Sequence, residues 1–113
     1  MVRSSLAAVA VGALLALPSA ARAQDAKVTH GMEVFAAQHC SLCHAIAGKG
    51  NAKGALDEVG SKLKAEEIRE WITDAKGMTA KTKATRKPEM KQYTLAKDDV
   101  DALVAYLETL KKK

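Results

Sequence analysis

The chain has 113 residues, two cysteines and a formal net charge of +5 at pH 7. A chain of this length holds one domain at most. Nucleic-acid-binding domains usually concentrate many more cations on one face, so nucleic acid is not expected as the main partner. Such a mild basic excess suits docking onto an acidic protein surface better.

The first 23 residues have the pattern of an export signal. Arg3 supplies a positive start, residues 6–17 are an uncharged apolar run, and the sequence Ala-Arg-Ala at 21–23 offers a cleavage site. The run of 12 residues is shorter than the roughly 20 that a membrane-spanning helix needs, so no stable membrane insertion is expected. We therefore predict a signal peptide over residues 1–23, a domain over 24–113 and a periplasmic location.

Helices dominate the predicted secondary structure of residues 24–113, which contain no convincing strand pattern. A helix is predicted over residues 30–40, with Thr29 as its N-cap, because apolar residues recur there at helical spacing. Its shared face consists of Met32, Phe35, Ala36 and His39. Residues 40–62 lack such a period and contain four glycines, which predicts a turning loop.

Two further helices are predicted downstream. One begins near Ala65, places Trp71 on its apolar face and stops at Gly77. Residues 78–94 are predicted to be a loop. The last helix has the strongest pattern, although Ala96 is a poor N-cap and Thr94 is the nearest better candidate. Its apolar stripe consists of Val100, Leu103, Val104, Leu107 and Leu110.

The most specific pattern in the chain is Cys40-Ser41-Leu42-Cys43-His44. Two thiols separated by two residues can reach the two vinyl groups of one porphyrin, and a histidine directly after them can bring its imidazole under the iron. The pattern predicts one covalently bound haem c.

Three other interpretations of the two cysteines compete with haem attachment. A zinc site would need two further ligands, and the chain has neither a second cysteine pair nor an HxxxH motif. A redox-active thiol pair is typical of alternating strands and helices, which the pattern does not indicate. A structural disulfide suits an exported protein, but it does not explain His44.

The second axial ligand of a haem is less clearly indicated by the residues themselves. Met32 is predicted in the core, whereas Met78 and Met90 both lie in the predicted loop and either can reach the opposite face of the ring. His30 and His39 are expected at a helix end and at a solvent or haem-edge position rather than at the iron.

These features together resemble those of the small class I c-type cytochromes, over nearly all of residues 24–113. The resemblance rests on the haem-attachment motif, a glycine-rich loop, the helix with Trp71, a methionine loop and a last helix with Tyr106. It implies an all-α fold with three to four helices around one haem. It also implies that the first and last helices cross, with Gly31 and Phe35 against Tyr106.

The family's functional roles can be transferred residue by residue. The resemblance implies that Cys40 and Cys43 form the thioethers, that His44 is the proximal ligand and that Met90 is the distal ligand. Trp71 matches the family's tryptophan beside a haem propionate, and a plain core aromatic is an equally good interpretation.

Two departures from the family pattern are present. Lys91 stands where a proline usually follows the axial methionine. Lys53-Gly54 stands where Gly-Pro usually presents a carbonyl to the proximal histidine, so Gly54 keeps the carbonyl without the stiffness of proline.

The resemblance implies an electron carrier that alters no substrate and docks in turn onto redox donors and acceptors. Residues 76–91 are the densest basic stretch, with Glu89 as its only acid, and they are either a docking surface or a solvated loop. Two alternatives remain: peroxidase-like or gas-binding chemistry at a labile distal site, and a thiol protein without haem.

Overall fold

The computed structural model describes residues 7–13 and 19–113. Its helices are α1 (Ser19–Ala37), α2 (Val59–Lys62), α3 (Ala65–Thr73), α4 (Ala75–Thr82) and α5 (Lys97–Glu108). The short strands β1 (Ala45–Ile46) and β2 (Lys49–Gly50) form an antiparallel hairpin. The all-α prediction is therefore confirmed, with two more short helices than the sequence indicated.

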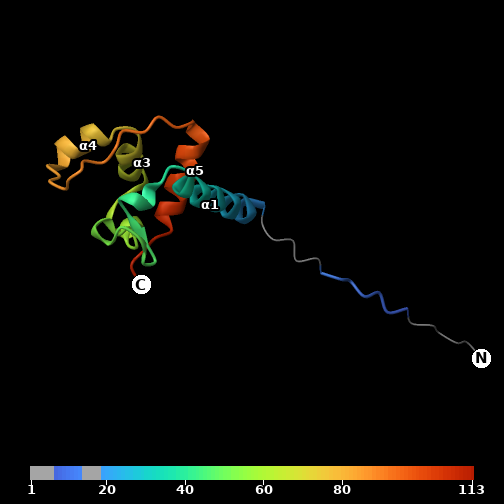
Figure 1. Cartoon of the computed structure of the whole chain (residues 1–113). Coiled ribbons are helices and arrows are strands. Elements are labelled where there is room, and N and C mark those ends of the chain that lie inside the picture. The colour runs from blue at the N-terminus through green and yellow to red at the C-terminus, as the bar shows by residue number, and fades with distance from the viewer. Residues whose placement is uncertain (1–6, 14–18) are drawn as a thin grey trace, which may run out of the picture.

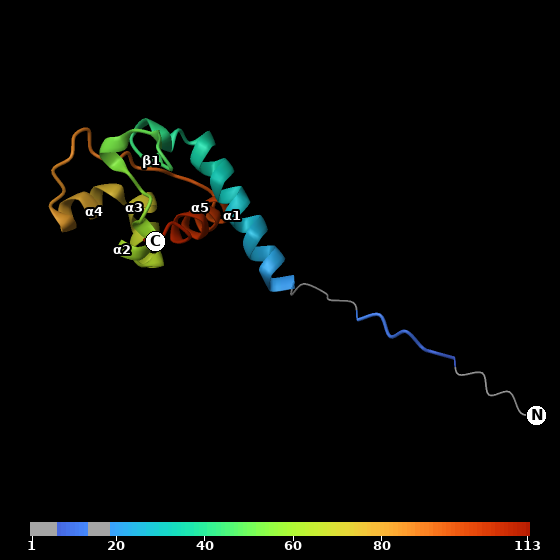
Figure 2. The same ribbon diagram turned by 90° about the horizontal axis from the view of Figure 1, so that it is seen from below.

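The core lies where α1 and α5 cross and α3 packs against α5 (Figures 1 and 2). Its buried members are Val34, Ile68, Ile72, Val100, Leu103, Val104 and Leu107. The stripe predicted for the last helix is the core face of α5 at Val100, Leu103, Val104 and Leu107, whereas its fifth member, Leu110, lies beyond the helix end at Glu108 and packs against the core from there. No side-chain hydrogen bond caps this helix at Ala96.

The predicted crossing contact between the first and last helices is confirmed. The rings of Phe35 and Tyr106 meet edge to face, with centroids 6.1 Å apart. A Cβ added to Gly31 would overlap the Ala102 carbonyl oxygen and lie 2.6 Å from Tyr106 Cβ. Only glycine at this position lets the two backbones approach so closely.

Two predictions for the first helix are wrong. α1 already begins at Ser19, so Thr29 lies inside the helix and caps nothing. The alanines before Thr29 have high helix propensity and extend the helix toward the N-terminus. Met32 is 51% exposed rather than part of the core, because it points away from the crossing with α5.

The predicted helix stop at Gly77 and the loop after it are also wrong. α3 ends at Thr73, and Asp74 starts α4 by accepting a hydrogen bond from the Gly77 amide at 3.2 Å. A capping carboxylate stabilises the first turn of a helix despite a glycine in it. α4 escaped prediction because only Ala75 and Met78 in it are buried, which is too few to give an apolar period.

His30 joins the two crossing helices at the surface. Its Nε2 lies 2.7 Å from Asp99 Oδ1 of α5, and its Nδ1 lies 3.3 Å from Glu33 Oε2. The bond to Asp99, and then the bond to Glu33, raise the pKa of His30 above its usual 6.5. His30 therefore lies at neither a helix end nor the cavity described below.

A raised histidine pKa stabilises the folded state below the unfolded pKa, and this contribution is lost as the pH rises through the folded pKa. We therefore expect the melting temperature of the unmutated protein to exceed that of His30→Gln more at about pH 5.5 than at about pH 8.5. Thermal unfolding of both proteins across this range measures the difference. Parallel pH profiles would contradict the bridge between α1 and α5.

No helix within residues 7–13 and 19–113 is both long enough and apolar enough to cross a bilayer.

Candidate functional site

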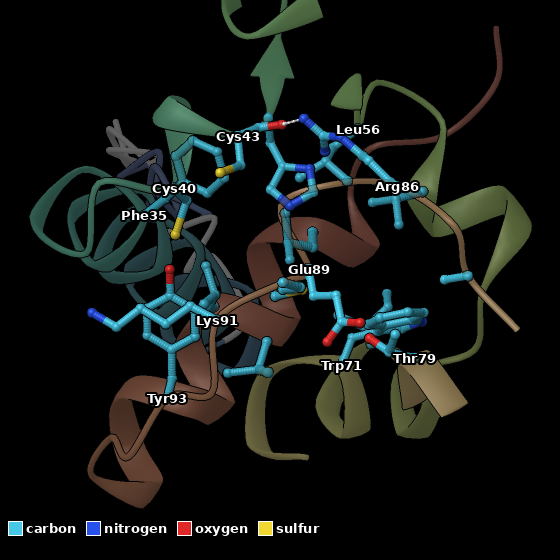
Figure 3. A pocket seen from close by; sticks show the side chains of 18 of the residues that line it. Phe35, Cys40, Cys43, Leu56, Trp71, Thr79, Arg86, Glu89, Lys91 and Tyr93 are labelled. Atoms are coloured by element: carbon cyan, nitrogen blue, oxygen red, sulfur yellow. Dashed lines mark hydrogen bonds between the residues drawn. The ribbon is translucent and has the colours of Figure 1, made fainter. Parts of the chain in front are cut away.

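A cavity of about 530 Å³ opens between the end of α1, helices α3 and α5, and the segment that leads into α5 (Figure 3). Aliphatic and aromatic side chains form most of its wall. Those from the core side are Phe35, Leu56, Val59, Leu63, Ile68, Ile72, Leu103 and Leu107. Such a wall suits a large and mostly apolar group.

The two cysteines and the histidine of the sequence motif line the same wall. α1 ends at Ala37, and His39 adopts a left-handed conformation with φ of 55°, which turns the chain into a 3-10 turn at Cys40–Leu42. The thiols of Cys40 and Cys43 are not bridged to each other. Burial raises the pKa of the Cys40 thiol, so this thiol is neutral at pH 7.

The His44 ring is fixed from behind by the backbone. Its Nδ1 donates a hydrogen bond to the Gly54 carbonyl oxygen at 2.9 Å, as the resemblance to class I c-type cytochromes implied. Nε2 is then the nitrogen that is left to bind a metal. Burial lowers the pKa of His44, which keeps the ring neutral and its nitrogen available as a ligand.

Gly54 is required here by a close approach of three groups. A Cβ at this position would overlap the Cys43 carbonyl oxygen and the Arg86 guanidinium, and it would lie 2.9 Å from His44 Nδ1. The space that a proline ring would take is thus already filled. This explains physically why glycine replaces the proline of the usual family pattern.

The structure separates the two candidate methionines. Met90 is half-buried and lines the cavity. Met78 belongs to α4, is only 4% exposed and does not line the cavity. Among the methionines of the described chain, Met90 is therefore the one that the fold brings to the space beside Cys40 and His44.

Trp71 also reaches the cavity, from α3. Its side chain and that of Thr79 from α4 lie at the end farther from the two cysteines in Figure 3. An indole N–H and a hydroxyl are both able to donate to a carboxylate. Trp71 is only partly buried, which suits a position at the edge of a bound group better than one in the centre of a core.

Residues 28–111 match the model of the family described as Cytochrome c. The chain belongs to the cytochrome c family. This family binds covalently attached haem c and transfers electrons through it, and the cavity is the candidate site for that haem.

One curated relative of this cytochrome c is a protein named "Cytochrome c oxidase subunit 2" from Alkalihalophilus pseudofirmus. The two chains are 30% identical over 90 residues, which cover 72% of this chain and 25% of the relative. The chain thus spans about a quarter of the relative's length. No solved structure matches the chain.

The residues around the cavity fit a haem c. The volume lies within the range of about 300–1,000 Å³ that is usual for cofactor sites. The wall is apolar, the two thiols and an imidazole with a free Nε2 lie together on it, and a thioether lines the same space.

Several residues of this candidate haem site had no signal in the sequence. Tyr93 and Thr79 line the cavity, and burial raises the pKa of the Tyr93 phenol. Arg86 Nη2 donates a hydrogen bond to the Cys43 carbonyl at 2.6 Å, across 43 positions of sequence. No local pattern indicates such a contact, because it depends on how the segment before α5 folds back over the motif.

Proposed function

We propose that this cytochrome c is a periplasmic electron carrier with one haem c. Cys40 and Cys43 form its thioether bonds, His44 Nε2 is the proximal ligand and Met90 Sδ is the distal ligand. The bound haem supplies an iron that takes up and releases one electron at a time. The observation that carries the proposal is that all four of these residues line one apolar cavity.

The ligand pair suits electron transfer rather than chemistry on a substrate. When both axial positions are filled, the iron changes oxidation state with little change in geometry, and a thioether raises the reduction potential. The hydrogen bond from His44 Nδ1 to the Gly54 carbonyl orients the ring and makes Nε2 a stronger ligand. The apolar wall would lower the polarity around a bound haem and so favour its reduced state.

We also propose that the chain is not an enzyme. A catalytic distal pocket needs an acid or base positioned at the reacting atoms. Glu89 is the one carboxylate among the cavity residues, and it is exposed and paired with Lys87 Nζ at 2.9 Å. We infer that Trp71 donates to a haem propionate instead of taking part in a reaction.

The proposed location follows from the export signal over residues 1–23. Residues 1–6 and 14–18 of this signal lie outside the described part of the chain. Cleavage after Ala23 would shorten α1 and leave the crossing residues Gly31 and Phe35 in place. Export of the chain before haem is attached to its CxxCH motif agrees with the proposed periplasmic location.

For the partners, we propose acidic surfaces of redox proteins. Six basic residues lie on α4 and on the segment before α5, all of them are exposed, and Arg86 and Lys91 line the cavity. They are Lys76, Lys81, Lys83, Arg86, Lys87 and Lys91. Because one relative is named for cytochrome c oxidase, a terminal oxidase is the first acceptor to test.

Replacement of both Cys40 and Cys43 by Ala is expected to abolish covalent haem attachment, because no thiol then remains to react with the vinyl groups. Each single variant is expected to keep one thioether. Haem staining after denaturing electrophoresis, with pyridine haemochrome spectra that report the number of thioethers, measures both effects.

The matched control is Ser41→Ala, since Ser41 lies between the two thiols and is exposed. This variant is expected to attach haem as the unmutated protein does. Covalent haem on the double cysteine variant would contradict the proposed attachment.

A further inference from the structure

The segment that carries Met90 has little local structure of its own. It runs from the end of α4 at Thr82 to the start of α5 at Lys97 and contains no regular element. Residues 84–89 are all exposed. Lys91 also stands where a proline would restrict the backbone. Something beyond local conformation must therefore hold Met90 against the cavity.

Two side chains hydrogen-bond this segment to the rest of the domain, one on each side of Met90. Before it, Arg86 Nη2 donates to the Cys43 carbonyl oxygen at 2.6 Å (Figure 3). After it, Gln92 donates through Nε2 to the Thr73 carbonyl, and its Oε1 lies 3.4 Å from the Lys76 amide. The first connection involves a charged donor, which makes it the stronger kind of hydrogen bond.

The connection through Arg86 ends at the haem-attachment turn. Cys43 precedes His44, and its carbonyl lies next to Gly54, whose own carbonyl receives the His44 hydrogen bond. The guanidinium fills space that Gly54 leaves because it has no side chain. Arg86 thus connects the segment that carries Met90 directly to the backbone that holds His44, the proposed ligand on the other side of the haem.

We propose that Arg86 is a positioning residue that holds Met90 on the iron by tying its segment to the Cys43 carbonyl. The inference rests on the proposed function, since it requires Met90 to be the distal ligand. Release of the tie leaves the thioethers and His44 in place, but it increases the fraction of molecules in which the methionine has left the iron. A competing ligand then binds more tightly, in proportion to that fraction.

The test is a titration of the ferric holoprotein with imidazole, followed by the loss of the sulfur-to-iron absorption band. Arg86→Met is expected to bind imidazole about tenfold more tightly than the unmutated protein. Lys87→Met is the matched control, because it removes one exposed cation from the same segment, and its affinity is expected to change by less than about twofold.

Two results separate the failure of this inference from the failure of the Met90 assignment. If Arg86→Met and the unmutated protein bind imidazole with equal affinity, the inference is overturned and Met90 ligation stands. The same conclusion holds if the variant unfolds at a lower urea concentration but its imidazole affinity is unchanged, because Arg86 then has only a structural role. Absence of the sulfur-to-iron band from the unmutated protein would overturn the Met90 assignment itself. Should Arg86→Met not accumulate with haem, Arg86→Gln serves in its place, and the same tightening is expected because its amide is shorter and uncharged.

Discussion

Met90→Ala is expected to remove the sulfur-to-iron absorption band of the ferric protein while haem stays attached through Cys40 and Cys43. The iron then loses its distal ligand and becomes open to external ligands. Loss of the methionine sulfur removes a ligand that favours the ferrous form, so the reduction potential of the haem falls. We expect the fall to be a sizeable part of the roughly 0.8 V range over which axial ligands set haem potentials. Spectra and protein-film voltammetry measure both changes.

The control for this prediction is Met78→Leu. Met78 is 4% exposed, so truncation to Ala would leave a cavity and unfold part of the population, whereas Leu keeps the volume. This variant is expected to retain the band and the potential. Loss of the band in Met78→Leu with its retention in Met90→Ala would reverse the ligand assignment.

Gly31→Ala is expected to destabilise the protein by about 1–3 kcal/mol, and Gly31→Val by more. The added Cβ meets the Ala102 carbonyl oxygen and Tyr106 Cβ, which belong to the backbone and to the root of a side chain in α5. Neither can move aside without moving the helix. Urea unfolding of the ferric holoprotein gives the free energies of unfolding.

The sign of the change makes the Gly31 prediction decisive. Helix propensity alone would make Gly31→Ala stabilising by about 1 kcal/mol, because glycine is a poor helix former. Ala36→Val on the exposed face of α1 controls for the effect of a β-branched residue in the same helix and is expected to cost less than about 1 kcal/mol. A more stable Gly31→Ala variant would contradict the close crossing of α1 and α5.

The parts of the fold that the sequence predicted are those with a local or strongly periodic signal. The stripe of α5 is continuous because one whole face of this helix meets α1 and α3, and Leu103 and Leu107 also face the cavity. The CxxCH motif is contiguous, so its two thiols and His44 are certain to lie together.

The parts that the sequence did not predict depend on contacts distant in the chain or on weak patterns. α4 is set by the Asp74 cap and by burial of Ala75 and Met78, and such a short helix has no clear apolar face. Met32 has the spacing of a core residue, but the crossing with α5 uses the neighbouring Gly31 instead. Periodicity identifies a face of a helix and does not reveal which face has a partner.

Some residues of the candidate site could be predicted from the sequence, and others depend on contacts between distant parts of the chain. The choice between Met78 and Met90 needed the resemblance to a family, and the cavity supports the choice of Met90. The bond between Arg86 and Cys43 had no sequence signal, because a basic residue in a basic stretch is most simply explained as surface.

The absorption spectrum of the unmutated protein, produced with the machinery that attaches haem, tests the His44 and Met90 ligation most directly when it is recorded in the oxidised and reduced forms. We predict a low-spin ferrous spectrum and, in the oxidised form, the weak near-infrared band of sulfur-to-iron coordination. A high-spin spectrum, or an oxidised form without that band, would contradict a carrier with His44 and Met90 as ligands and would indicate an iron open to external ligands.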